Sequence, residues 1–111
     1  MENIEMPKEL KQAAMSLLFE NDWENPMYMC DASMKMMSSL FYRLCGGTEK
    51  EMQRWKMKEV LKWGELGVIA VFALVDAGYL YWDEHNEDYL RRAEGIEETP
   101  LFDEWRNMTR G

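Results

Sequence analysis

The residues best suited to chemistry in this chain lie together in the segment "WDEHNEDY", residues 82–89. It holds the one histidine, His85, among four carboxylates: Asp83, Glu84, Glu87 and Asp88. Carboxylates three and four residues apart share a helix face and can bind a divalent cation. No second histidine and no E-x-x-H pair completes a transition-metal set, so the pattern favours a solvated acidic surface. We predict no metal or other cofactor.

The two cysteines, Cys30 and Cys45, lie fifteen positions apart without a C-x-x-C motif. We expect reduced thiols in a cytoplasmic protein, and the acidic start of the chain has no apolar stretch of the kind found in signal peptides. A pairing of either thiol with His85 as nucleophile and base has no supporting motif. The Gly46-Gly47 pair is typical of a helix end, not of a phosphate loop. The sequence therefore predicts no enzyme.

Acidic residues outnumber basic ones by 21 to 13, which gives a net charge of −8. Such a protein repels phosphate backbones, so direct nucleic-acid binding is not expected, whereas a basic protein surface is complementary to it. The acidic residues concentrate in the C-terminal third of the chain. The residues that we predict to bind a partner are Asp83, Glu84, Glu87, Asp88, Glu94, Glu97 and Glu98.

One basic stripe interrupts this acidic chain, and its members follow one another at four-residue spacing: Lys50, Arg54, Lys58 and Lys62. Neighbouring Glu51 and Glu59 can balance these charges on a solvated helix face. Two functional alternatives are a nucleic-acid grip, which the net charge opposes, and a contact with the acidic segment 83–88. That contact could form within the chain or in a homodimer.

The least polar stretch, residues 66–82, has three interpretations. As a membrane span it is short and carries Asp76 near its middle, so the apolar gain and the cost of the charge nearly cancel. As a hairpin it would turn at "DAG", residues 76–78, but no third strand is evident. As a central helix it explains a row of small residues at helical spacing that would let a neighbour approach closely: Gly64, Gly67, Ala70, Ala73 and Ala77.

We therefore predict an all-α fold, a compact single-domain helical bundle of about five helices around a buried central helix at 66–82. The other helices are expected over 8–23, 26–45 and 48–63 and from Pro100 onward, on the strength of caps, prolines and apolar spacing. The domain spans 1–111. Residues 26–45 also carry a methionine-rich seam, which is expected to be core, with an exposed binding groove as the alternative: Met27, Cys30, Met34, Met37, Phe41 and Leu44.

These patterns favour a small acidic protein that acts by protein–protein interaction. Its concrete form is an adaptor or inhibitor that occupies a basic surface of a partner, including one that normally holds nucleic acid. The alternatives are a single-span or membrane-associated protein using residues 66–82, and a metal enzyme working through the 83–88 cluster.

Overall fold

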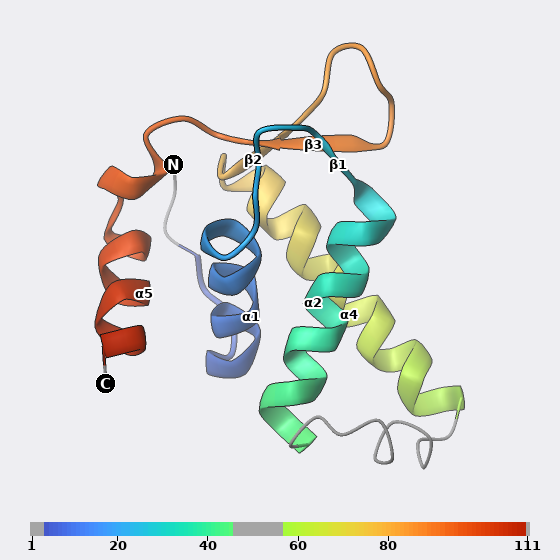
Figure 1. The fold of residues 1–111 in the computed structure, drawn as a ribbon. Helices are drawn as coiled ribbons and strands as arrows, with labels where there is room; N and C mark the ends of the chain where they lie inside the picture. Colours follow the sequence, from blue (N-terminus) through green and yellow to red (C-terminus); the bar gives the residue numbers. More distant parts are fainter. Residues whose placement is uncertain (1–3, 46–56, 111) are drawn as a thin grey trace.

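The computed structural model of the chain describes residues 4–45 and 57–110, with side chains over 4–43 and 62–109. Within these residues it contains four α-helices and a short three-stranded sheet at one end of the molecule (Figure 1). The prediction of a compact, mostly helical protein is confirmed. The finer prediction of an all-α bundle of five helices is not, because three segments form strands.

The first helix, α1 (Lys8–Phe19), follows Pro7 and buries the predicted apolar face, from Leu10 to Leu18. It ends at Phe19 rather than at Trp23 because side chains beyond it bind its last carbonyl oxygens. The Asn21 amide donates to the carbonyls of Ser16 and Leu17 at 3.3 and 3.1 Å. The Trp23 indole donates to Leu17 as well, at 3.0 Å. Such side-chain donors satisfy groups that a helix end otherwise leaves unpaired.

Residues 26–45 form a strand and a helix rather than one helix. The strand β1 (Met27–Tyr28) pairs with a later strand, and α2 (Met29–Cys45) starts immediately after it. Among the α2 residues whose side chains are described, the buried ones are Ala32, Ser33, Met36, Leu40 and Phe41. The predicted seam is therefore wrong at Cys30 and Met34, which are exposed. The buried face is displaced around the helix because α2 packs against both α1 and α4.

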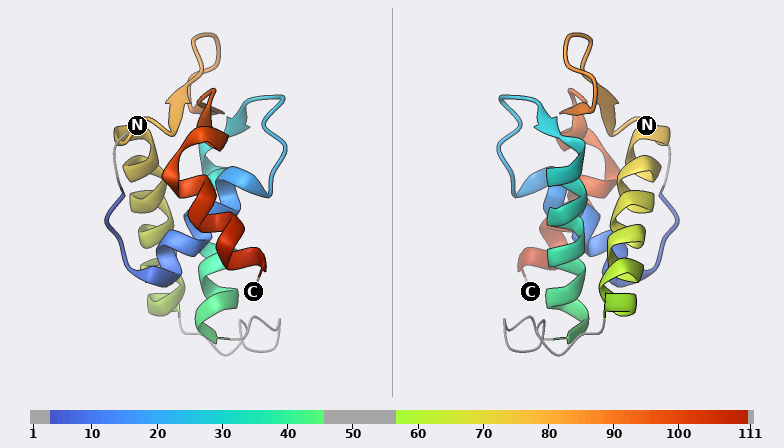
Figure 2. Two further views of the ribbon diagram at one scale, coloured as in Figure 1. Left: turned by 90° about the vertical axis from the view of Figure 1, so that its left-hand side faces the viewer. Right: turned by 90° about the vertical axis from the view of Figure 1, so that its right-hand side faces the viewer.

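The helix α4 (Met57–Asp76) packs against α2, and the two helices lie side by side in the right-hand view of Figure 2. The α4 helix runs without interruption through Gly64 and Gly67. A Cβ atom at Gly67 would lie 2.8 Å from the Ser33 carbonyl oxygen, so the two backbones approach more closely there than a side chain permits. Ala70, one turn further along α4, is 1% exposed. The predicted close contact between helices is confirmed at Gly67.

The expected helix over 66–82 is wrong beyond Asp76. The chain leaves α4 through Gly78, whose φ of 88° is unfavourable for residues with a Cβ. The Tyr79 N–H donates to the Leu74 carbonyl at 2.9 Å and the Gly78 N–H to the Val75 carbonyl at 3.1 Å, which is a Schellman ending. The next residues form β2 (Leu80–Trp82). Asp76 is exposed at the helix end and needs no buried partner.

The strand β3 (Tyr89–Arg92) is the centre of the sheet, antiparallel to β1 on one side and to β2 on the other. Leu90 lies opposite both Met27 and Trp82, and Leu80 lies opposite Arg92. Leu80 and Leu90 are almost fully buried, so this face of the sheet covers the helices.

After the sheet, a single 3₁₀ turn, η1 (Ile96–Glu98), leads into α5 (Pro100–Arg110), whose start was predicted correctly. The Phe19 ring lies 5.2 Å from the Phe102 ring and 5.3 Å from that of Trp105, which fixes α5 against α1. The Thr99 hydroxyl donates to the Ile96 carbonyl at 2.6 Å. One cluster of buried residues, from Ile4 to Leu101, joins these elements.

Candidate protein-interaction surface

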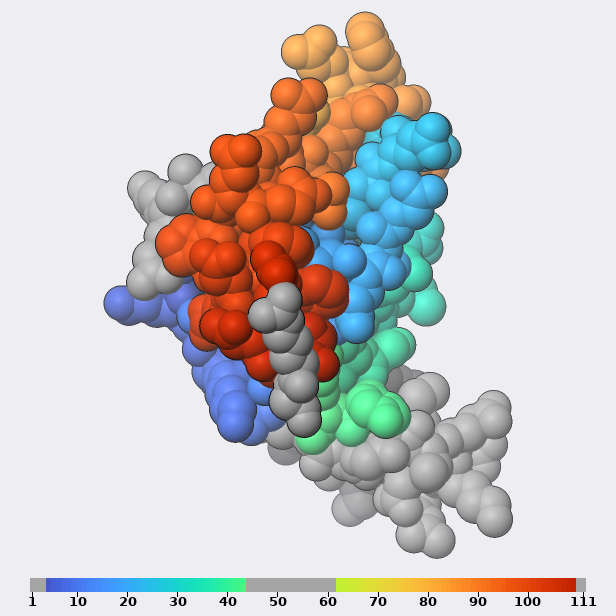
Figure 3. All heavy atoms as spheres, turned by 60° about the vertical axis from the view of Figure 1, so that its left-hand side comes forward, coloured from blue at the N-terminus to red at the C-terminus, as the bar shows by residue number. Residues whose placement is uncertain are grey.

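The seven carboxylates predicted to bind a partner lie in two groups at opposite ends of β3. The loop that joins β2 to β3 carries Asp83, Glu84, Glu87 and Asp88, and the segment after β3 carries Glu94, Glu97 and Glu98. The loop projects from one end of the molecule, at the top of Figure 3. All seven residues are exposed except Asp83.

Asp83 anchors the loop through its side chain, which is only 4% exposed. Its carboxylate accepts hydrogen bonds from the Arg91 Nε at 2.6 Å and from the Asn86 N–H at 2.9 Å. It also accepts from the His85 N–H at 3.2 Å. The bond from Arg91, helped by the other donors and opposed by burial, lowers the pKa of Asp83, and the same pairing raises the pKa of Arg91. The loop therefore has a fixed, ion-paired base.

Asp88 fixes the other end of the loop. Its φ of 66° places it in the left-handed region, which aspartate tolerates better than most residues. Its carbonyl accepts a 2.7 Å hydrogen bond from the Met29 N–H at the start of α2. The carboxylates of Glu84, Glu87 and Asp88 form no ion pair within the described part of the chain. They therefore face solvent without a cationic partner among the described residues.

The loop residues do not converge on a cation. Over residues 4–45 and 57–110, no group of three or more histidine, cysteine, aspartate or glutamate side chains is arranged to hold a metal ion. Cys30 is a free, exposed thiol, and the side chain of Cys45 lies outside the described residues. Most of the predicted basic stripe also lies outside the residues with described side chains. Of its four members, Lys62 has a described side chain, which is exposed.

The outward face of the sheet carries three tyrosines that the sequence interpretation missed. Tyr28 lies opposite Tyr89, with ring centroids 5.3 Å apart, and Tyr81 lies opposite Arg91 on the neighbouring strand. Their exposed fractions are 38%, 37% and 47% for Tyr28, Tyr89 and Tyr81. The signal that could have found Tyr81 is the alternation of tyrosine with leucine in "YLYW", residues 79–82, since aromatic residues at a period of two favour strands.

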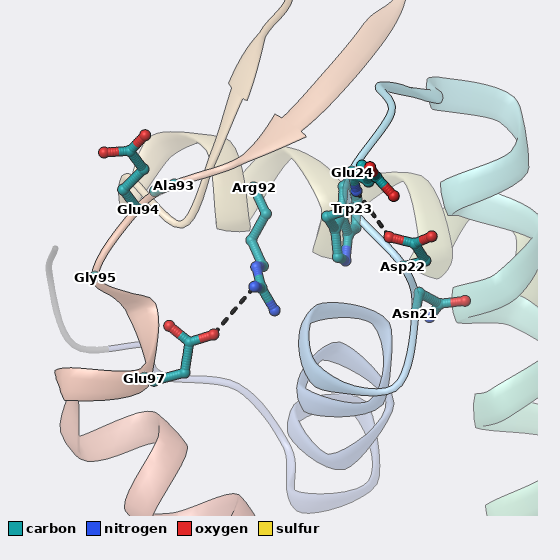
Figure 4. Close-up of a pocket in the computed structure, with 9 residues that line it drawn as sticks. All are labelled: Asn21, Asp22, Trp23, Glu24, Arg92, Ala93, Glu94, Gly95 and Glu97. Carbon is teal, nitrogen blue, oxygen red and sulfur yellow. Dashed lines mark hydrogen bonds and ion pairs between the residues drawn. The ribbon is translucent and has the colours of Figure 1, made fainter.

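A shallow pocket of about 480 Å³ lies where the α1–β1 connection meets the segment after β3 (Figure 4). Its lining residues are Asn21, Asp22, Trp23, Glu24, Arg92, Ala93, Glu94, Gly95 and Glu97. Arg92 extends into its centre, where it donates to the Leu18 carbonyl at 2.9 Å and to the Glu97 carboxylate at 3.1 Å. In Figure 4 the Glu94 carboxylate points away from Arg92.

The polar groups at the centre of this pocket serve to cap α1. Arg92, Asn21 and Trp23 all donate to carbonyl oxygens of its last turn. A positive charge at a helix C-terminus also complements the helix dipole. The lining of the pocket is mostly acidic, because Asp22 and Glu24 add to the predicted Glu94 and Glu97. Sequence reasoning missed Asp22 and Glu24 because they are distant in the chain from the acidic C-terminal third.

An apolar groove of about 420 Å³ runs between α2 and α4. Met34 and Met37 line one side and Val68 the other, so part of the methionine-rich segment forms an open groove and part of it forms core. Met34 is 59% exposed. The two sequence interpretations of these methionines, core and groove, therefore both apply, each to a different side of α2.

Residues 66–82 are divided between a helix end and a strand, so they do not form the single helix that the membrane alternative requires. Among the residues that the structure describes, no helix combines the length and apolar character needed to cross a bilayer. Comparisons of the chain with protein-family models, with curated proteins and with solved structures found no match.

Proposed function

We propose that the chain is a protein-interaction protein without enzymatic activity, an adaptor or inhibitor that covers a basic surface of a partner protein. The observation that carries the proposal is the placement of exposed carboxylates at both ends of β3. Five of them have no ion pair among the described residues: Glu84, Glu87, Asp88, Glu94 and Glu98. Carboxylates without internal partners are free to complement basic side chains of another molecule.

The anchoring of the acidic loop supports this proposal. The Asp83–Arg91 ion pair and the bond from Met29 to Asp88 hold the loop at both ends. A loop that is already ordered loses little entropy when it binds, so a larger part of the contact energy appears as affinity. In its narrower form, the proposal is that the covered surface is one that otherwise binds phosphates, which the carboxylates replace.

The test measures association with a fluorescent oligolysine peptide by stopped-flow anisotropy at low and at physiological salt. The acidic-surface variant carries Glu84→Lys and Glu87→Lys, both at exposed loop positions. Asp88 is left intact because its positive φ makes a lysine there strained. The matched control, Glu5→Lys with Glu65→Lys, changes the net charge by the same amount at exposed positions outside 83–98.

We expect the loop variant to associate about tenfold more slowly at low salt than the control variant, and its rate to depend less on salt. Circular dichroism melts should remain unchanged, since neither glutamate is buried or paired. Equal rates for the two variants would refute the placement of the site. A loss of stability in the loop variant would instead favour an internal role, in which these carboxylates neutralise the basic stripe.

A further inference from the structure

The outward face of the sheet is an aromatic surface bordered by the acidic loop. Tyr28 and Tyr89 form a directly opposed pair on β1 and β3. Tyr81 on β2 lies opposite Arg91, which is two residues after Tyr89 on β3 and therefore on the same face. Residues that are diagonal neighbours on adjacent strands are roughly 7–8 Å apart, a separation that aromatic side chains can reach across. A side chain that contacts the Tyr89 ring is therefore within reach of the Tyr81 ring.

The charges around these rings are mostly negative. The contact with the Cys30 thiol is the largest influence that raises the pKa of Tyr28, and the negative charge of Asp88 acts in the same direction. Glu84 and Glu87 are exposed in the adjoining loop. Among the described strand residues that face outward, Arg91 is the cation, and it is neutralised by its 2.6 Å contact with Asp83. The face therefore combines exposed aromatic rings with uncompensated negative charge.

We propose that this face binds arginine side chains of a basic segment in a partner protein, with the guanidinium groups stacked on Tyr81 and Tyr89 and paired with the loop carboxylates. The inference rests on the proposed function and adds to it the residue type that the partner must present. A planar guanidinium stacks on an aromatic face and pairs with a carboxylate at the same time, whereas an ammonium group is more strongly hydrated. Arginine is therefore preferred over lysine at equal charge.

A nucleic-acid base is the other planar group that stacks on exposed rings. Proteins that bind single strands surround such rings with lysine and arginine, because the phosphates need countercharges. The tyrosines of this sheet are bordered by carboxylates, and the nearby arginine is already paired with one. The charge arrangement therefore selects a cationic partner.

The test compares oligoarginine and oligolysine peptides of equal length in equilibrium anisotropy titrations. In the platform variant, Tyr81→Thr with Tyr89→Thr, threonine removes the rings and keeps strand propensity. The control variant is Tyr42→Ala, which removes a tyrosine that is 66% exposed on α2, away from the sheet. A Tyr81→Phe and Tyr89→Phe variant keeps the rings and removes only the hydroxyls.

We expect the wild-type protein to bind oligoarginine roughly fivefold more tightly than oligolysine. The platform variant should lose this preference while its oligolysine affinity changes less than about twofold. The control and phenylalanine variants should keep the preference. Because the platform variant could fold poorly, NMR of the wild-type protein provides an independent measurement. Oligoarginine should shift the ring resonances of Tyr81 and Tyr89 and leave those of Tyr42 in place.

The outcomes separate this inference from the proposed function. Equal affinity for both peptides, unaffected by the threonine substitutions, would refute the arginine platform and leave the acidic surface intact. Failure of the wild-type protein to bind either peptide would refute both. Binding of a single-stranded RNA oligonucleotide that is lost in the platform variant would show that the rings stack on bases, which overturns the inference.

Discussion

Replacement of Gly67 by alanine should force α2 and α4 apart. The added Cβ would lie 2.8 Å from the Ser33 carbonyl oxygen and 3.4 Å from the Met37 backbone nitrogen. Both of these atoms belong to the α2 backbone, so neither can rotate away as the end of a flexible side chain would. Gly64, one helical turn earlier in the same helix, provides the matched control, because a Cβ there would meet only the Met37 sulfur, at an ordinary 3.9 Å.

Two effects of opposite sign determine the size of the change. Alanine is better than glycine in a helix interior by about 1 kcal/mol, and this gain applies to both variants. Overpacking of a well-packed interface costs about 1 to 3 kcal/mol and applies only to Gly67→Ala. We therefore expect Gly64→Ala to stabilise the protein by up to ~1 kcal/mol. The difference between the two variants isolates the overpacking cost.

The assay is thermal unfolding followed by circular dichroism. For a chain of 111 residues, 1 kcal/mol corresponds to about 4 °C in Tm, so the two variants should melt about 4 to 12 °C apart. The control variant should be the more stable. If Gly67→Ala melts at the same temperature as Gly64→Ala, the close approach of α2 and α4 at Ser33 is wrong.

Four further substitutions test the packing and electrostatics of the fold. Ala70→Leu should lower the free energy of unfolding by about 1 to 3 kcal/mol, because Ala70 is 1% exposed and a leucine there would overpack the core. Chemical unfolding measures this change. The pairing with Arg91 lowers the pKa of Asp83 below 3.8, the ordinary value for an aspartate. The ion pair therefore stabilises the fold fully at a pH above 3.8, and this stabilisation is lost as the pH falls through the lowered pKa of the folded state. Melting temperatures of Asp83→Asn should therefore depend less on pH than those of the wild type below that value. Arg92→Met should cost about 1 to 2 kcal/mol through the lost bond to the α1 end, whereas Glu97→Gln, at an exposed pair, should cost less than about 1 kcal/mol in the same unfolding assay.

The sequence predicted where α1 and α5 begin, because the start of a helix depends on residues next to it in the chain. Pro7 and Pro100 start helices at the expected positions, since proline fits the first turn. The small residues around Gly67 predicted a close helix contact because their effect is steric and requires only the helical period. The start of the helix expected over 48–63 lies outside the described residues and remains a prediction.

The sheet could not be predicted in the same way because its strands are short and pair across long separations. β1 has two residues and β2 has three, too few to show a clear period. The position of Gly78 after an apolar helix was readable as a C-terminal signal, but we predicted a helix that continues through residue 82 and considered a turn at "DAG" only in the hairpin alternative. The turn is present, and it joins a helix to a strand.

The same limit applied to the candidate surface. Sequence reasoning placed the exposed glutamates in the acidic C-terminal third, since composition alone reveals them. It could not separate Asp83, whose carboxylate is buried by Arg91, from Glu84, which is exposed, because the difference depends on strand register. The tyrosine face was missed for the same reason, since its members come together only when β1 and β2 both pair with β3.

The register of β3 links the core to the proposed interaction surface. Leu90 points inward and is fully buried, so its neighbours Tyr89 and Arg91 must point outward, because successive side chains alternate across a strand. Opposite them, the buried Leu80 fixes Tyr81 on the outward face in the same way. A shift of the register by one residue would turn the tyrosines into the core and expose the leucines, at a cost of roughly 2 kcal/mol for each buried leucine. The core therefore holds the aromatic face in one orientation, independently of whether a partner is bound.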